Sequence, residues 1–70
     1  MPKETIQFIG KEYLQKNTLE DPDFYAGLSK NETAARVKKD FEEDRVIFVS
    51  GWVLSETEAR QCAAIQIKNK

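Results

Sequence analysis

The N-terminal stretch of the chain alternates apolar and polar positions with the period of a helix. From Lys3 to Asn17, apolar side chains recur every three or four residues with Glu, Gln and Lys between them, which predicts an amphipathic helix. This apolar stripe consists of Ile6, Ile9, Tyr13 and Leu14. Gly10 lies on the same stripe, and a glycine costs a helix about 1 kcal/mol relative to alanine. We therefore expect another helix to approach closely at Gly10.

Two further helices are predicted from their capping signals. The first runs from Ser29 to Asp44, where Ser29 and Glu32 have the spacing of a capping box, although Asn31 could serve as the cap instead. Its apolar face consists of Ala34, Val37 and Phe41. Ser55-Glu56-Thr57-Glu58 carries the same capping signal and opens the last helix. Small and apolar residues of that helix are Ala59, Cys62, Ala63 and 65–67.

A short helical turn is predicted between the first two helices. Asp21 is a favourable N-cap, and Pro22 suits the first helical position because its ring presets the backbone angle. The turn from Pro22 to Leu28 would bury some combination of Phe24, Tyr25 and Leu28, and Gly27 indicates an early stop.

The segment from Arg45 to Leu54 changes character. A β-branched and aromatic run, Val46 to Val49, is followed by Ser50-Gly51 and then by Trp52-Val53-Leu54. Two apolar runs around Ser-Gly are compatible with a small hairpin. The alternative is an extended, buried segment that crosses between the helices. We favour the second, because an isolated hairpin is marginal unless it packs on helices.

These elements predict an all-α fold, a small bundle of three main helices plus a short helical turn, with a short extended segment at 46–49. We expect one domain spanning residues 1–70. The predicted core consists of Ile6, Ile9, Tyr13, Leu28, Val37, Phe41, Ile47, Val49, Trp52, Leu54, Cys62 and Ile65.

The small size of the chain limits how much core it can form. A chain of 70 residues buries only about 60% of the surface that it exposes when unfolded. Domains this small often gain stability from disulfides, a metal or a partner. Cys62 is the only cysteine and the chain has no histidine, so neither an internal disulfide nor a zinc site is expected. A partner chain or close helix packing remains as the source of additional stability.

Charge and hydropathy exclude several classes of function. Charged residues make up 33% of the chain, but the net charge is only −1 and the two signs are interspersed, whereas nucleic-acid binding needs a basic face. No nucleic-acid partner is therefore expected. No run approaches the roughly 20 apolar residues of a membrane span, and residues 1–13 contain no apolar signal region.

The reactive residue types do not assemble into a recognisable catalytic, cofactor or metal motif. Cys62 is expected to be a small buried hydrophobic residue, since no histidine is available to activate it. The acidic run from Asp40 to Asp44 lacks the alternating ligands and glycine of a calcium loop. Ser29 and Ser55 are better explained as helix caps than as nucleophiles. The sequence therefore predicts a protein that is not an enzyme.

Three aromatic residues are candidates for contact with a partner. Phe8 lies off the main apolar stripe of its helix, so it either widens the buried face or contacts another protein. Tyr25 and Trp52 belong to the residue types that dominate binding hot spots. For Trp52 we favour a core position over a partner contact, because the chain is expected to cross the hydrophobic centre there.

Several short motifs resemble a bacterial family. They are Ile9-Gly10-Lys11-Glu12-Tyr13-Leu14, Asp40-Phe41, Gly51-Trp52-Val53-Leu54-Ser55 and Thr57-Glu58-Ala59-Arg60-Gln61-Cys62-Ala63. Together they resemble the mature part of small bacterial proteins of unknown function exported by the twin-arginine route. The resemblance implies a periplasmic or exported location and an N-terminal signal that this sequence does not contain; without it, a cytoplasmic location is expected. It implies no catalytic residue.

Two functions are compatible with these observations. The first is a non-catalytic protein-interaction module that binds a protein partner or itself, such as the small accessory subunit or folding partner of a larger exported protein. The second is a small-ligand-binding domain or a fragment of an enzyme, in which Tyr13, Tyr25 and Trp52 would line a shared pocket.

Overall fold

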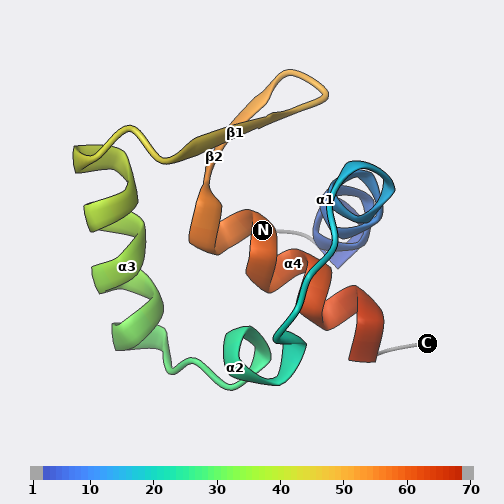
Figure 1. Ribbon diagram of the computed structural model, residues 1–70, viewed down its shortest axis with the longest axis horizontal. Helices are drawn as coiled ribbons and strands as arrows, with labels where there is room; N and C mark the ends of the chain where they lie inside the picture. The colour runs from blue at the N-terminus through green and yellow to red at the C-terminus, as the bar shows by residue number, and fades with distance from the viewer. Residues whose placement is uncertain (1–2, 69–70) are drawn as a thin grey trace.

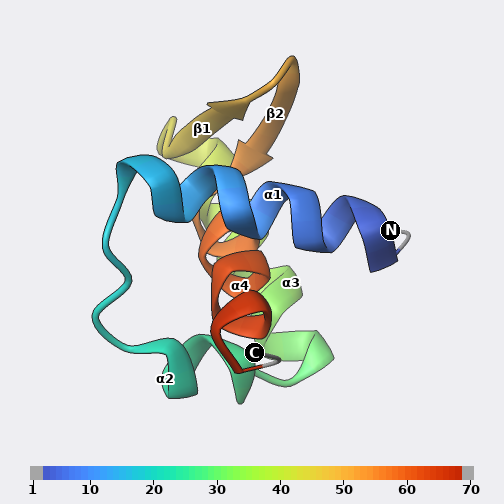
Figure 2. The ribbon, with the colours of Figure 1, turned by 90° about the vertical axis from the view of Figure 1, so that its right-hand side faces the viewer.

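The computed structural model describes residues 3–68, which form four helices and one hairpin (Figure 1). The elements are, in chain order, α1 (Lys3–Lys16), α2 (Pro22–Ala26), α3 (Lys30–Glu42), β1 (Val46–Val49), β2 (Trp52–Ser55) and α4 (Glu56–Lys68). The last helix, α4, packs against every other element. Figures 1 and 2 show the hairpin at one end of the molecule and α2 at the other, with α1 crossing α4 between them. None of the helices in residues 3–68 has both the length and the apolar character needed to cross a bilayer.

Both predicted capping boxes are confirmed. The N–H of Glu32 donates to Ser29 Oγ and the N–H of Ser29 donates to Glu32 Oε1, each at 3.1 Å. Ser29 is therefore the cap of α3, and the alternative at Asn31 is wrong. At the start of α4, the Glu58 N–H donates to Ser55 Oγ at 3.0 Å and the Ser55 N–H donates to Glu58 Oε1 at 3.1 Å. Each pair provides partners for backbone donors that a helix start leaves free.

The short helix α2 also starts as its sequence predicts. Asp21 Oδ1 accepts a hydrogen bond from the Phe24 N–H at 3.4 Å, and Pro22 occupies the first helical turn. The helix ends at Ala26, and Gly27 is its C-cap.

The segment from 46 to 55 is a β-hairpin, so the all-α prediction is wrong. β1 pairs antiparallel with β2, and Val49 and Trp52 flank a two-residue turn. Ser50 (φ 46°) and Gly51 (φ 87°) both have positive φ, as a type I′ turn requires. That turn matches the twist of the strands, and packing on α1 and α4 gives the hairpin the support that it lacks in isolation. The extended, buried segment that was predicted to cross between the helices is therefore not present.

Two adjoining clusters form the hydrophobic core. One consists of Ile9, Val49, Leu54 and Cys62 with the partly buried Ile6 and Ile47; the other consists of Tyr13, Ala59 and Ala63 with the partly buried Leu14, Leu19 and Ile47. Ile47 therefore joins the two. The predicted core position is wrong for Phe41 and Trp52, which are 46% and 49% exposed. Near the end of α3 the buried position belongs to Asp40, and the next residue, Phe41, is rotated 100° away around the helix.

Gly10 permits a close contact between α1 and α4, as its place on the apolar stripe predicts. A Cβ atom at this position would lie 2.6 Å from the carbonyl oxygen of Cys62 and 3.0 Å from the Cβ of Gln66, both on α4. Only glycine fits between the two helices at this distance.

Candidate functional site: the hairpin patch and the Arg60 cleft

The two faces of the hairpin have different surroundings. Residues directly opposite each other in an antiparallel pair share a face, and successive residues alternate between faces. Val49 and Leu54 belong to the face that packs on the core, and each is at most 5% exposed. The pair on the other face, Phe48 and Val53, is 74% and 52% exposed. The hairpin thus presents an apolar outer surface to solvent.

Trp52 lies at the rim of the hairpin and not in the core. It is paired with Val49 next to the turn, on the core-facing side, but half of the indole stays exposed. We call Phe48 and Val53, on the outer face, and Trp52, on the opposite face beside the turn, together the hairpin patch. Phe48 and Trp52 alone leave roughly 250 Å² of aromatic surface in water, given the size of such side chains.

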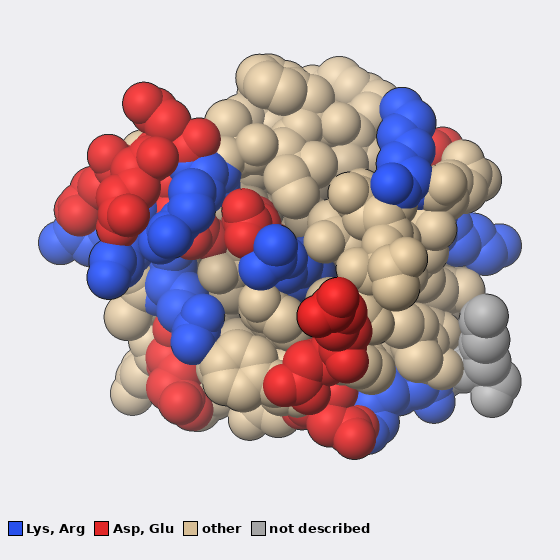
Figure 3. Space-filling view, viewed as in Figure 1, with Lys and Arg blue, Asp and Glu red and all other residues tan. Residues whose placement is uncertain are grey.

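No charged residue interrupts the hairpin. The ten residues from Val46 to Ser55 contain no Asp, Glu, Lys or Arg, in a chain of which 33% is charged. Figure 3 shows the surface over β1 and β2, at the top of the view, without charged atoms, whereas both signs crowd the surface over α3. The largest apolar patch of a typical monomer is about 300–600 Å² and is often functional.

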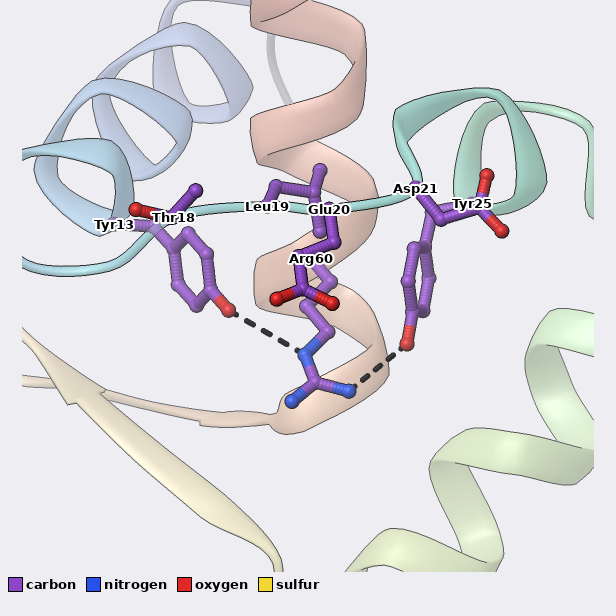
Figure 4. A pocket seen from close by; sticks show the side chains of 7 residues that line it. All are labelled: Tyr13, Thr18, Leu19, Glu20, Asp21, Tyr25 and Arg60. Carbon is purple, nitrogen blue, oxygen red and sulfur yellow. Dashed lines mark hydrogen bonds between the residues drawn. The ribbon is translucent and has the colours of Figure 1, made fainter.

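A second feature, the Arg60 cleft, lies between α1, α2 and α4. The Nε of Arg60 donates to the hydroxyl of Tyr13 at 3.4 Å, and its Nη1 donates to the hydroxyl of Tyr25 at 2.9 Å (Figure 4). Its Nη2 lies 2.7 Å from Glu56 Oε1. Burial opposes the charge of the guanidinium, but the two hydroxyls and the Glu56 carboxylate together raise the pKa of Arg60. Arg60 therefore joins three helices through one cation.

The cleft around Arg60 is polar and has a volume of about 390 Å³. Its lining residues are Tyr13, Thr18, Leu19, Glu20, Asp21, Tyr25 and Arg60. Tyr13 and Tyr25 share this cleft, but Trp52 does not line it and lies on the hairpin, at the opposite end of the molecule (Figures 1 and 2). The prediction that Tyr13, Tyr25 and Trp52 line one pocket is therefore wrong for Trp52.

The three predicted partner residues do not form one surface. Tyr25 is half-buried in the Arg60 cleft, whereas Trp52 belongs to the hairpin patch. Phe8 is 43% exposed on α1. It lies two residues from Gly10, about 200° around the helix, and Gly10 faces α4. Phe8 therefore lies on the side of α1 that is turned away from α4.

Sequence reasoning missed Phe48, Val53 and Arg60. Strand alternation would have placed Phe48 and Val53 outward if the hairpin had been chosen over the buried crossing. Nothing in the local sequence indicates that Arg60 meets two tyrosines that lie 47 and 35 residues away. Within residues 3–68, no three side chains of His, Cys, Asp or Glu are grouped so that they could hold a metal ion.

Comparison of the chain with protein-family models, with curated proteins and with solved structures found no match.

Proposed function

We propose that this protein is a non-catalytic protein-interaction module that docks through its hairpin patch. The observation that carries the proposal is Phe48, which is 74% exposed within a run of ten consecutive uncharged residues. An aromatic ring left in water forgoes a burial free energy of about 1.5–3 kcal/mol. A partner surface that covers the Phe48 ring would gain this free energy of burial.

The composition of the patch supports this role. Trp52 contributes an aromatic side chain of the type most enriched in binding hot spots, and half of its indole is exposed to a partner. Val53 lies directly opposite Phe48 and extends the same apolar surface. Following the resemblance to twin-arginine-exported proteins, we further propose that the partner is a larger exported protein that this chain serves as an accessory subunit or folding partner.

Site-specific photocrosslinking tests the proposal. A benzophenone amino acid is placed at Phe48 and, as a matched control, at Phe24, which is a 41% exposed phenylalanine on α2, at the other end of the molecule. Both proteins are irradiated in cells of the organism that encodes the chain. We expect a discrete protein adduct from position 48 and none from position 24. Equal labelling from the two positions, or no adduct from position 48, would contradict the proposal.

The Arg60 cleft favours a second candidate function, binding of a small polar ligand. The cleft volume of about 390 Å³ falls in the range of small-molecule sites. Because Arg60 lines the cleft together with Glu20 and Asp21, a zwitterion such as a free amino acid would find charges of both signs. A thermal-shift screen with amino acids tests this candidate, since tight binding raises the melting temperature. No shift at millimolar concentrations would exclude it for this ligand class.

A further inference from the structure

The hydrogen-bond phase of the hairpin determines which backbone groups point outward. The Glu56 N–H donates to the carbonyl oxygen of Arg45 at 3.0 Å, so this pair is a hydrogen-bonded one. Bonded and non-bonded pairs alternate along an antiparallel ladder. Counting from this pair, Val46–Ser55 and Phe48–Val53 are the non-bonded pairs. The N–H and C=O groups of these residues therefore point away from the partner strand.

The outer edge of β2 is shortened by the helix that follows it. The outward N–H of Ser55 donates to the Glu58 carboxylate, and α4 begins at the next residue. On β1, by contrast, no hydrogen bond within residues 3–68 uses the outward backbone groups of Val46 or Phe48. β1 is therefore the longer open edge.

The β1 edge is short, but it lacks a lysine, a proline and a bulge, three features by which proteins prevent strand pairing. Natural edge strands are protected by lysine, proline, a bulge or a covering element. β1 reads Val-Ile-Phe-Val, and its pairing with β2 is regular over all four positions. A regular edge with free outward backbone groups is a template for another strand.

We propose that β1 pairs antiparallel with β1 of a second copy of this chain, so that two hairpins form one four-stranded sheet across a two-fold axis. Each outward residue then pairs with the other outward residue of the second copy, Val46 with Phe48 and Phe48 with Val46. This register gives about four backbone hydrogen bonds. The inference goes beyond the proposed function, because it adds self-pairing through the β1 edge to the binding of a protein partner on the hairpin patch.

Charge and symmetry favour a second copy as the partner. In this register Arg45, the only charged residue adjoining β1, falls opposite Val49 of the second copy and not opposite another Arg45. No like charges therefore meet across the new ladder. Val46 and Phe48 lie on the same face of the strand, so each Phe48 ring packs beside a valine from the other chain. A two-fold arrangement satisfies both edges at once, as is usual for homodimers.

The pairing is expected to be weak. Two edges of four residues form an interface below the size of stable complexes, which bury about 1,200–2,000 Å². We expect dissociation constants of roughly 10 μM to 1 mM, typical of small transient contacts.

Sedimentation velocity on synthetic protein tests the edge itself. The 70-residue chain can be made chemically with a methyl group on the backbone nitrogen of Phe48, which removes the outward donor but keeps the side chain. The matched control carries the same methyl group on Val53, the outward donor of β2. We expect the unmodified and Val53-methylated chains to dimerise equally, and the Phe48-methylated chain to associate at least about tenfold more weakly. Equal association of all three chains would overturn the proposal.

Hydrogen exchange on the unmodified protein needs no variant. Because the Phe48 amide points outward, we expect it to exchange quickly at low protein concentration and about 2- to 15-fold more slowly near 1 mM, the range that these dissociation constants imply, while the Val53 amide exchanges quickly at both. Fast exchange of Phe48 at both concentrations would overturn the dimer. If Phe48 nevertheless crosslinks to a different protein, the proposed function stands and only the self-pairing fails.

Discussion

Asp40, near the end of α3, accepts a hydrogen bond from the backbone N–H of Thr57, in the first turn of α4, at 2.8 Å from its Oδ2. Its other oxygen, Oδ1, lies 3.3 Å from Nε of Arg45. The Asp40 carboxylate, 17 residues away along the chain, thus accepts from one of the backbone N–H groups that the start of α4 leaves free. Burial alone would raise the pKa of Asp40, but the Thr57 hydrogen bonds and the Arg45 charge outweigh it and lower the pKa.

Asp40→Ala should destabilise the protein by about 1–3 kcal/mol, because it leaves the buried Thr57 N–H and the Arg45 cation without their partner. Urea unfolding at pH 7 measures the loss, and Glu42→Ala, at an exposed position of the same helix, is the matched control. Because the folded-state pKa of Asp40 is lowered, its contribution is present above the unfolded pKa of 3.8 and is lost as the pH falls through the folded value. The difference between wild type and Asp40→Ala should therefore shrink below about pH 4. A difference that is the same at pH 2 and pH 7 would contradict the role assigned to the charge.

Gly10→Ala should destabilise the protein by about 1–3 kcal/mol, although alanine is the better helix former by about 1 kcal/mol. The added methyl group would meet the Cys62 carbonyl oxygen at 2.6 Å, and both are held by backbone. Thermal unfolding measures the change, and Gln15→Ala, at an exposed position of α1, is the control. A stabilised Gly10→Ala protein would show that α1 and α4 lie farther apart.

Trp52→Ala should leave the protein folded and cost about 1 kcal/mol, because half of the indole is already in water. A fully buried tryptophan would cost about 3–5 kcal/mol. Since Trp52 is the only tryptophan, its fluorescence gives an independent check, and we expect an emission maximum near that of a solvent-exposed indole. If the Trp52→Ala protein unfolded, Trp52 would be a core residue, as the sequence predicts.

The Cys62 thiol should react slowly in the folded protein. Burial, assisted by the negative charge of Glu58, raises the pKa of Cys62 from 9.0 to about 11, which lowers the thiolate fraction at pH 8 about 100-fold. Ellman's reagent should label the folded chain at least about 100-fold more slowly than the urea-unfolded chain. Above pH 9, stability should fall as the pH rises toward 11, since the unfolded thiol ionises first. Rapid labelling of the native protein would show that Cys62 is accessible.

Ser55→Ala should cost about 1 kcal/mol, the usual effect of removing an N-cap. Ser29→Ala provides the comparison, because Ser29 forms the same capping box at an exposed position whereas Ser55 is fully buried. We expect the Ser55 substitution to be the more damaging of the two in chemical denaturation. The reverse order would mean that α4 does not depend on this cap.

Local signals in the sequence predicted the helices because the interactions that start them are local. Ser29 with Glu32 and Ser55 with Glu58 are each three residues apart, so the capping partners can be read directly from the chain. The sequence favours the buried crossing over the hairpin because an isolated short hairpin is marginal unless it packs on helices. What selects the type I′ turn is the packing of Val49 and Leu54 on Ile9 and Cys62, and these contacts join distant segments.

By itself, the sequence determined where three of the helices begin, that Ile9 and Tyr13 face inward, and that Gly10 lies at a close contact. Each follows from the period of the helix or from partners within one turn. Only the tertiary structure decided that Phe48 faces solvent, that Asp40 caps a helix 17 residues away, and that Arg60 links Tyr13 to Tyr25. The hairpin could present either face to α1 and α4, and the two arrangements differ in which apolar residues are buried. That choice is made by the shape of the core, which forms only when elements far apart in sequence pack together.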